Sequence, residues 1–359
     1  MGFRRMSDSK SIKSLVLVVG AGASKEANLP TGAELKHKIA TALDVRFKGY
    51  EMERGDDIVA QALNILTRNQ GRPQDINAYI QISRLIASAM PQAQSIDNFI
   101  DSHKKDPRIA QCGKLAITRC ILSAETHSLM MVDRSNIYNK INFTSLEPTW
   151  FNAFFQLIVE NRDHEELPER LSKLAVISFN YDRCIEHFLH SSFQNYYGIS
   201  PEQATALMSN LEIYHPYGTV GALPWVSQAQ RIDYGGAPHS QQLLELSNNI
   251  RTFTEGTDAK SSDIVAIRNV IQTAKRVVFL GFAFHQLNLE LLYERPSAPR
   301  SARACPVYAT AVGISESDAH IIRNELHTVG GHELNQIFLR RDLKSGDLFR
   351  EYWRSLSLG

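Results

Sequence analysis

Short apolar runs followed by polar turns mark the beginning of this chain, and they indicate a buried strand. Residues 15–19 are apolar and β-branched, and Gly20 stands directly behind them. A buried parallel strand that ends in a tight turn has this pattern. Residues 34–43 then have helical composition. The sequence therefore predicts a strand, a glycine turn and a helix, in that order.

The same alternation of strands and helices returns in the second half of the chain. Strands that alternate with helices favour a parallel sheet covered on both faces. We therefore expect an α/β protein with a Rossmann-like parallel sheet, helices on both faces and a large helical insertion. The expected strands cover 174–179, 211–214, 276–280 and 307–312, and the expected helices cover 183–190, 318–326 and 347–356.

Between about residues 50 and 170 the pattern changes to apolar residues at helical spacing. Amphipathic stretches lie around Ile80, Ile121 and Phe154, and none of them alternates as a strand does. A helical segment of this length approaches the size of a domain. The expected division is a flexible leader at 1–13, a Rossmann-like core at 14–49 and 171–359, and a helical insertion at 50–170.

Composition excludes few classes of function. The 39 basic residues nearly balance the 38 acidic ones, so no general attraction to nucleic acid or anionic membrane is expected. No run approaches the length of a membrane helix, and the polar, basic first residues lack the apolar stretch of a secretory signal. The four cysteines form no C-x-x-C pair. Free thiols in the cytoplasm and no metal site are therefore expected.

The strongest local signal is the glycine turn behind the first strand. Glycines there let the backbone approach a pyrophosphate, and the next helix directs its amides towards it. The dinucleotide fingerprint needs a third glycine where Lys25 stands, and the Walker pattern is missing, so a hydride-transfer dehydrogenase is a weak alternative. A purely structural turn remains the other interpretation. The candidate cofactor-binding residues are Gly20, Ala21, Gly22, Ala23 and Ser24.

Polar residues also follow the strand expected at 174–179. Asn180 and Asp182 would lie at its carboxyl end, where open α/β sheets bind ligands. Asn and Asp are also preferred N-cap residues, so both could equally cap the following helix. His215 comes later, in the order His215-Pro216-Tyr217-Gly218. An imidazole is a ready general base near neutral pH, which makes His215 a catalytic candidate.

These motifs, taken in order, resemble the sirtuin family. Gly20 to Ser24 is similar to the family's opening motif, and Asn28-Leu29-Pro30-Thr31-Gly32 to its second half. Asn180-Tyr181-Asp182, followed by a helix that carries Glu186, resembles the sirtuin-like signature. Classical deacetylases continue with an Asp-Phe-Arg stretch that this chain lacks. The resemblance is therefore to the sirtuin-like, NAD-hydrolysing proteins of bacterial anti-phage defence systems.

The resemblance implies roles for individual residues. Asn180 would hold the ribose or an attacking water, Asp182 would orient it, and a histidine would complete the catalytic set. In the family that histidine usually stands directly before glycine, where this chain has Tyr217, so His215 and Tyr217 are both candidates. Phe282 and Phe284 could equally be core residues. The implied cofactor contacts also include Pro30, Thr31, Asp97, Tyr217, Gly281, Phe282, Phe284 and Asn288.

The activity implied by the resemblance is that of an NAD glycohydrolase. NAD would be the substrate, cleaved to nicotinamide and ADP-ribose, and depletion of NAD on activation would serve anti-phage defence. The cysteine pairs of a deacetylase zinc module are missing, so a deacylase or ADP-ribosyltransferase is the alternative. A non-catalytic NAD- or ADP-ribose-binding assembly subunit is another. The resemblance further implies a homo-oligomer and a partner, such as a HerA-like ATPase or another defence sensor.

Overall fold

The computed structural model of the chain describes residues 12–69, 76–132, 135, 139–228, 230–252, 255, 262–294 and 302–359. Residues 1–11 of the expected leader lie outside this part. Lys13, which was expected to belong to the leader, is buried. Its ammonium donates to the carbonyl of Ser172 and to the carboxylate of Glu212, both at 2.7 Å. Lys13 is therefore a fixed part of the fold.

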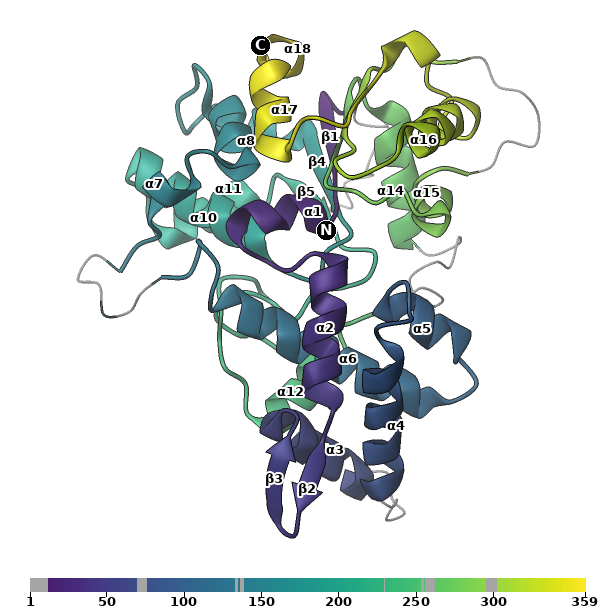
Figure 1. The fold of residues 1–359 in the computed structure, drawn as a ribbon. Helices are drawn as coiled ribbons and strands as arrows, with labels where there is room; N and C mark the ends of the chain where they lie inside the picture. The colour runs from purple at the N-terminus through teal and green to yellow at the C-terminus, as the bar shows by residue number, and fades with distance from the viewer. Residues whose placement is uncertain are drawn as a thin grey trace, which may run out of the picture.

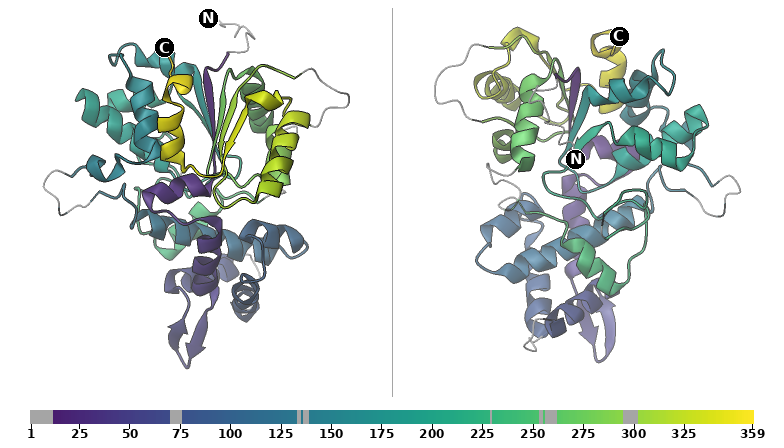
Figure 2. Two further views of the ribbon diagram at one scale, coloured as in Figure 1. Left: turned by 45° about the horizontal axis from the view of Figure 1, so that its top comes forward. Right: turned by 180° about the vertical axis from the view of Figure 1, so that it is seen from behind.

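A six-stranded parallel sheet forms the centre of the molecule, and it confirms the Rossmann-like prediction (Figure 2, left). The strand order is β5-β4-β1-β6-β7-β8. The chain therefore adds β4 and β5 on one side of β1 and the remaining strands on the other side. The strands are β1 (Leu15–Val19), β4 (Leu174–Ser178), β5 (Glu212–Tyr214), β6 (Val277–Leu280), β7 (Val307–Thr310) and β8 (Ile337–Arg340).

Both faces of the sheet are apolar because alternate residues of each strand point to opposite faces. Val16 and Val18 join one cluster of buried side chains, and Leu15 and Leu17 join the other. This accounts for continuous apolar runs in place of alternating ones. One face is covered by α8 (Trp150–Val159), α10 (Cys184–Tyr197), α11 (Pro201–Met208) and α17 (Ser345–Glu351), and the other by α14 (Ser262–Thr273), α15 (Gln286–Leu292) and α16 (Glu316–Thr328).

A separate helical layer lies beyond the carboxyl ends of the strands (Figure 1). Its helices contact one another more than they contact the sheet. We call this set the helical layer. It consists of α2 (Gly32–Leu43), α3 (Asp57–Asn69), α4 (Ile76–Ala89), α5 (Ile96–Ser102), α6 (Pro107–Glu125) and α12 (Ser240–Ser247), with the hairpin of β2 (Arg46–Lys48) and β3 (Glu51–Arg54) at its tip.

The packing does not follow the expected boundaries at 50 and 170. Helix α2 precedes residue 50 and α12 follows residue 170, yet both pack in the helical layer. Helix α8 falls between these boundaries but packs against α10 and α17, because Phe151, Phe154 and Leu157 bury its apolar side beside the sheet. The other short elements are α1 (Ala21–Ser24), η1 (Lys25–Ala27), α7 (Phe143–Leu146), α9 (Leu167–Ser172), η2 (Leu334–Gln336) and α18 (Trp353–Leu356).

The hairpin of β2 and β3 was not expected. Its strands are short, charged and mostly exposed, so they carry none of the apolar signal on which strand prediction depends.

Among the described residues, no helix is both long and apolar enough to span a membrane.

Candidate functional site

The glycine turn packs directly against the loop that follows β6. The amide of Gly20 donates to the carbonyl of Leu280 at 2.9 Å, and that of Gly22 donates to the carbonyl of Gly281 at 3.0 Å. A Cβ on Gly22 would lie 2.9 Å from the Cα of Gly281, which itself has a φ of +53°. Backbone meets backbone here, so there is no room for side chains at these positions.

This packing bears on the expected pyrophosphate site. The amides of Gly20, Gly22 and Ala23 all donate to carbonyls of the chain itself. The close approach of the two loops thus accounts for the glycines without any phosphate, as the purely structural interpretation expects. The outer side of the turn is nevertheless open, because Gly22 is exposed and Ala21 half-buried. Its inner end is Ser24, which is buried.

Pro30 and Thr31 lie where the turn leads into α2. Thr31 begins the helix with a capping box: its hydroxyl accepts from the amide of Glu34 at 3.4 Å, and its own amide donates to the Glu34 carboxylate at 2.8 Å. A hydrogen bond from Lys25, followed by that from Thr31, lowers the pKa of Glu34 to about 2. The structure therefore gives Thr31 a capping role beside the turn, and Pro30 is buried before it.

The end of β4 is joined to the glycine turn by buried side chains. The side-chain amide of Asn180 donates to the hydroxyl of Ser24 at 2.8 Å, and both residues are buried. Asp182 accepts from the amide of Cys184 at 3.1 Å, so it satisfies the first amide of α10. Burial raises the pKa of Asp182, although hydrogen bonds from Cys184 and from Ser24 oppose the rise. Ser24, Asn180 and Asp182 thus form one connected group, as a site at this edge requires.

His215 is bound on two sides. Its Nε2 lies 2.7 Å from a carboxylate oxygen of Glu186 on α10, and its Nδ1 lies 3.3 Å from the main-chain carbonyl oxygen of Asn180. Burial alone would lower the pKa of His215, but the Glu186 carboxylate outweighs it and raises that pKa. In turn, the charge of His215 overcomes burial and lowers the pKa of Glu186. The pair lines a cavity of about 450 Å³ whose wall is largely apolar.

Tyr217 points to a different element from His215. Its hydroxyl donates to the side-chain oxygen of Asn288 on α15 at 2.7 Å. Its ring meets that of Phe179 edge-on at 5.7 Å between centroids. Phe282 and Phe284 pack in the same aromatic cluster and are buried. Their structural role is therefore that of core residues, as the alternative interpretation expects.

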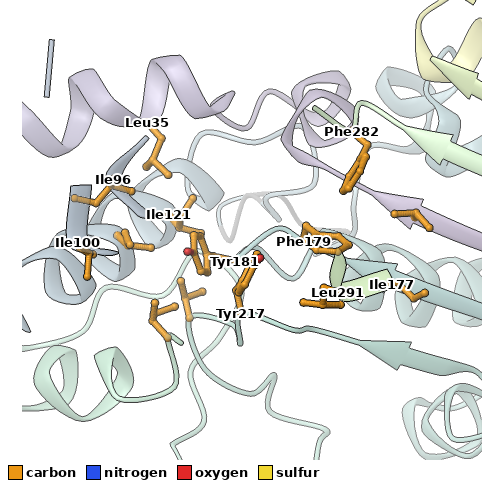
Figure 3. Close-up of a cluster of buried hydrophobic side chains, with 14 of the residues drawn as sticks. Leu35, Ile96, Ile100, Ile121, Ile177, Phe179, Tyr181, Tyr217, Phe282 and Leu291 are labelled. Carbon is orange, nitrogen blue, oxygen red and sulfur yellow. The ribbon is translucent and has the colours of Figure 1, made fainter. Parts of the chain in front are cut away.

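Asp97 reaches the end of β4 from the helical layer. The hydroxyl of Tyr181 donates to its carboxylate. Burial raises the pKa of both groups, and the hydrogen bond between them opposes the rise for Asp97 and adds to it for Tyr181. Figure 3 shows Tyr181 and Tyr217 between helical-layer side chains and the rings of Phe179 and Phe282. Tyr181 was not singled out as a candidate, although it stands inside the Asn-Tyr-Asp motif.

A buried ion pair fixes the same segment and was not predicted. The guanidinium of Arg183 bonds the carboxylate of Glu125 on α6 at 2.5 and 3.1 Å, and both side chains are buried. Arg183 also donates to the carbonyls of Ile232 and Asp233, and Glu125 accepts from the amide of Gly235. The partners are distant in the sequence, and neither belongs to a motif, so no local signal relates them.

Three groups therefore meet at this edge of the sheet. Ser24 links the other two residues of its group, since it accepts from the side-chain amide of Asn180 and also interacts with Asp182. Tyr181 bonds Asp97 and Tyr217 bonds Asn288. The side chain of His215 faces Glu186. Among the described residues, no three His, Cys, Asp or Glu side chains are placed to hold a metal ion.

No protein-family model matches the chain, and a comparison with curated proteins finds no relative.

Proposed function

We propose that this chain binds NAD across the carboxyl ends of β4, β1 and β6 and cleaves its nicotinamide–ribose bond. The observation that carries the proposal is the strand order. Successive strands are added on one side of β1 and then on the other, and in open α/β sheets ligands bind at such a switch point. The glycine turn follows β1, Asn180 follows β4, and the bond between Asn180 and Ser24 joins them there.

Cleavage of the nicotinamide–ribose bond requires few catalytic groups, and polar side chains that are partly shielded from water can supply them. Nicotinamide leaves as a neutral molecule from a cationic ring, and the ribose carbon acquires oxocarbenium character, much as in glycoside hydrolysis. A side-chain amide that places water or ribose hydroxyls then contributes by orientation. Asn180 takes this role in the proposal, and the open side of the glycine turn takes the pyrophosphate. The oxygen of water bonds the ribose carbon as the bond to nicotinamide breaks, and one proton of that water is released to solvent. The products are nicotinamide, ADP-ribose and this proton.

The test is incubation of the full chain with NAD, followed by chromatography of nicotinamide and ADP-ribose. Asn180→Ala is compared with Asn195→Ala, which alters an exposed asparagine on α10. The proposal predicts turnover in the wild type and in Asn195→Ala, and its loss in Asn180→Ala. Equal turnover in both variants would contradict the role of Asn180. Absence of both binding and turnover would contradict the proposal as a whole.

A second candidate is a subunit that binds NAD or ADP-ribose without cleaving it. The bonds of His215 favour it, because a carboxylate and a carbonyl occupy both ring nitrogens. A histidine in this arrangement is not poised to take a proton from water. Calorimetry that detects saturable NAD binding, with no nicotinamide released in the same sample, would support this candidate over the enzyme.

An enzyme that destroys NAD must be held inactive until it is needed. The proposal therefore includes a resting homo-oligomer or a separate partner, such as a HerA-like ATPase or another defence sensor, with the helical layer as the contact surface. Light scattering after size-exclusion chromatography measures the state of the chain. A monomer with full activity on its own would contradict this part of the proposal.

A further inference from the structure

We propose that Glu186 holds His215 as a doubly protonated imidazolium, and that the second N–H of this ring fixes the main chain of Asn180. His215 is then a positioning residue and not a general base. Only the effect of this arrangement on NAD cleavage rests on the proposed function. The protonation of His215 follows from its two partners.

Both partners of the His215 ring are acceptors. A neutral imidazole has one N–H and one bare nitrogen. The carboxylate of Glu186 stands at Nε2 and the carbonyl of Asn180 at Nδ1, at 2.7 and 3.3 Å. The lowered pKa of Glu186 keeps its carboxyl ionised, so it can only accept. Beside an ionised Glu186, either neutral tautomer of the ring would leave one of these oxygens facing a nitrogen lone pair. Only the imidazolium donates to both.

The charges around His215 favour the imidazolium. Glu186 lies on α10, and Asp182 contributes a second negative group from the turn that precedes that helix. Arg183, which lines the same cavity, is a nearby cation, but its guanidinium is bonded to Glu125. The raised pKa of His215 and the lowered pKa of Glu186 agree with an ion pair.

The consequence of this arrangement reaches the candidate site through one peptide. The carbonyl that accepts from His215 belongs to Asn180, whose side-chain amide bonds Ser24. Loss of the second N–H removes the donor from that carbonyl and releases one restraint on the residue. The Glu186–His215 pair, which lines the cavity, therefore helps to hold the main chain of Asn180 in place.

The direct test is a titration of the histidine ring protons by NMR in the full chain, with no NAD present. The signal of His215 is identified by its loss in His215→Asn, and exposed His320 on α16 serves as a control. We expect a midpoint above the ordinary histidine value of about 6.5. Glu186→Gln should lower the midpoint by at least about one pH unit, and Glu186→Asp should keep most of the elevation. The signal of His320 should not change between variants.

A His215 midpoint below the ordinary value, or one that Glu186→Gln leaves unchanged, would overturn the inference. If Glu186→Gln does not fold, the wild-type midpoint and that of Glu186→Asp still decide the question. The titration needs neither substrate nor turnover. A protein that titrates as expected but never binds or cleaves NAD would therefore refute the proposed function alone.

The pH dependence of NAD cleavage gives a second readout, of opposite sign for the two roles. If the imidazolium is required, kcat falls as pH rises through the raised pKa of His215. If His215 is a general base, kcat rises over the same interval. Glu186→Gln should move the falling limb to lower pH, and Glu186→Asp should restore it. A rising limb that follows the His215 midpoint would overturn the positioning role.

Discussion

The two halves of the candidate site are held in different ways. The glycine turn is fixed by backbone atoms, since its amides bond the main chain and a Cβ on Gly20 or Gly22 would collide with the loop of Gly281. The segment after β4 is fixed by side chains. Asn180 bonds Ser24, Tyr181 bonds Asp97, and Arg183 bonds Glu125.

The difference shows which half can be dissected by mutation. A backbone contact leaves no atom that can be removed and no space for one to be added, so the turn should respond as a unit. Each side-chain bond after β4 leads to a different element, namely α1, α5 or α6. These bonds can be broken one at a time, and their costs should differ with burial and charge.

The largest effect is expected for Gly281→Ala. The added Cβ would lie 2.0 Å from the amide nitrogen of Ala23, and the φ of +53° is unfavourable for alanine. We expect the free energy of unfolding to fall by about 5 kcal/mol or more, because the cost of overpacking and the cost of the strained backbone add. Gly32→Ala is the control, because nothing lies within 4 Å of its Cβ position. Urea denaturation that finds both variants equally stable would contradict backbone control of the turn.

Glu125→Gln should come next. It leaves the guanidinium of Arg183 buried without a counter-charge, which costs about 3–5 kcal/mol. The free energy of unfolding from urea titrations measures the cost. Arg183→Met added to Glu125→Gln should recover part of the loss, because the unpaired charge is then removed. A loss below about 1 kcal/mol for Glu125→Gln would show that the bond between Arg183 and Glu125 is not the strongest of the side-chain bonds after β4.

A smaller effect is expected for Asp97→Asn, and it should depend on pH. Because burial raises the pKa of Asp97, the folded state binds a proton more readily than the unfolded state. Wild-type stability should therefore fall as pH rises from the ordinary Asp pKa through the raised value. Asn carries no charge, so the variant should gain about 1–2 kcal/mol relative to the wild type across this interval. Urea titrations at several pH values test this, and a parallel pH dependence would contradict it.

Tyr217→Phe should have the smallest effect. It removes the hydrogen bond to Asn288 and leaves a buried amide oxygen without that donor. A loss of about 1 kcal/mol is expected in the free energy of unfolding. Tyr196→Phe, which alters an exposed ring, is the matched control and should change little. A cost above that of Glu125→Gln would reverse the ranking of the contacts.

The sequence predicted the central strands well because they are buried on both faces. Residues 174–179 and 276–280 were expected as strands, and β4 and β6 occupy 174–178 and 277–280. Strand β8 was not expected, because it has only four residues and alternates between buried and exposed positions. The placement of α8 beside the sheet was also not expected, since a pattern of apolar residues does not say which surface it covers.

For the candidate site, the sequence identified the strand ends but not the contacts between them. Ser24 and Asn180 were both proposed, and the structure joins them. The orientation of His215 was not predictable, because its partner oxygens come from another helix and from a peptide carbonyl. Glu125 carries no local signal, and it was not considered. Contacts of this kind depend on tertiary packing, which a single sequence does not display.

The central place of β1 has a consequence for synthesis. Leu15 pairs with Leu174, and Val16 pairs with Val277. At about 5–20 residues per second, roughly 10–30 s separate the emergence of β1 from that of its first neighbour. Until then an apolar strand with two open edges has no partner in the sheet. The nascent chain is therefore vulnerable to aggregation during this interval, and this strand is where a chaperone would be most useful to it.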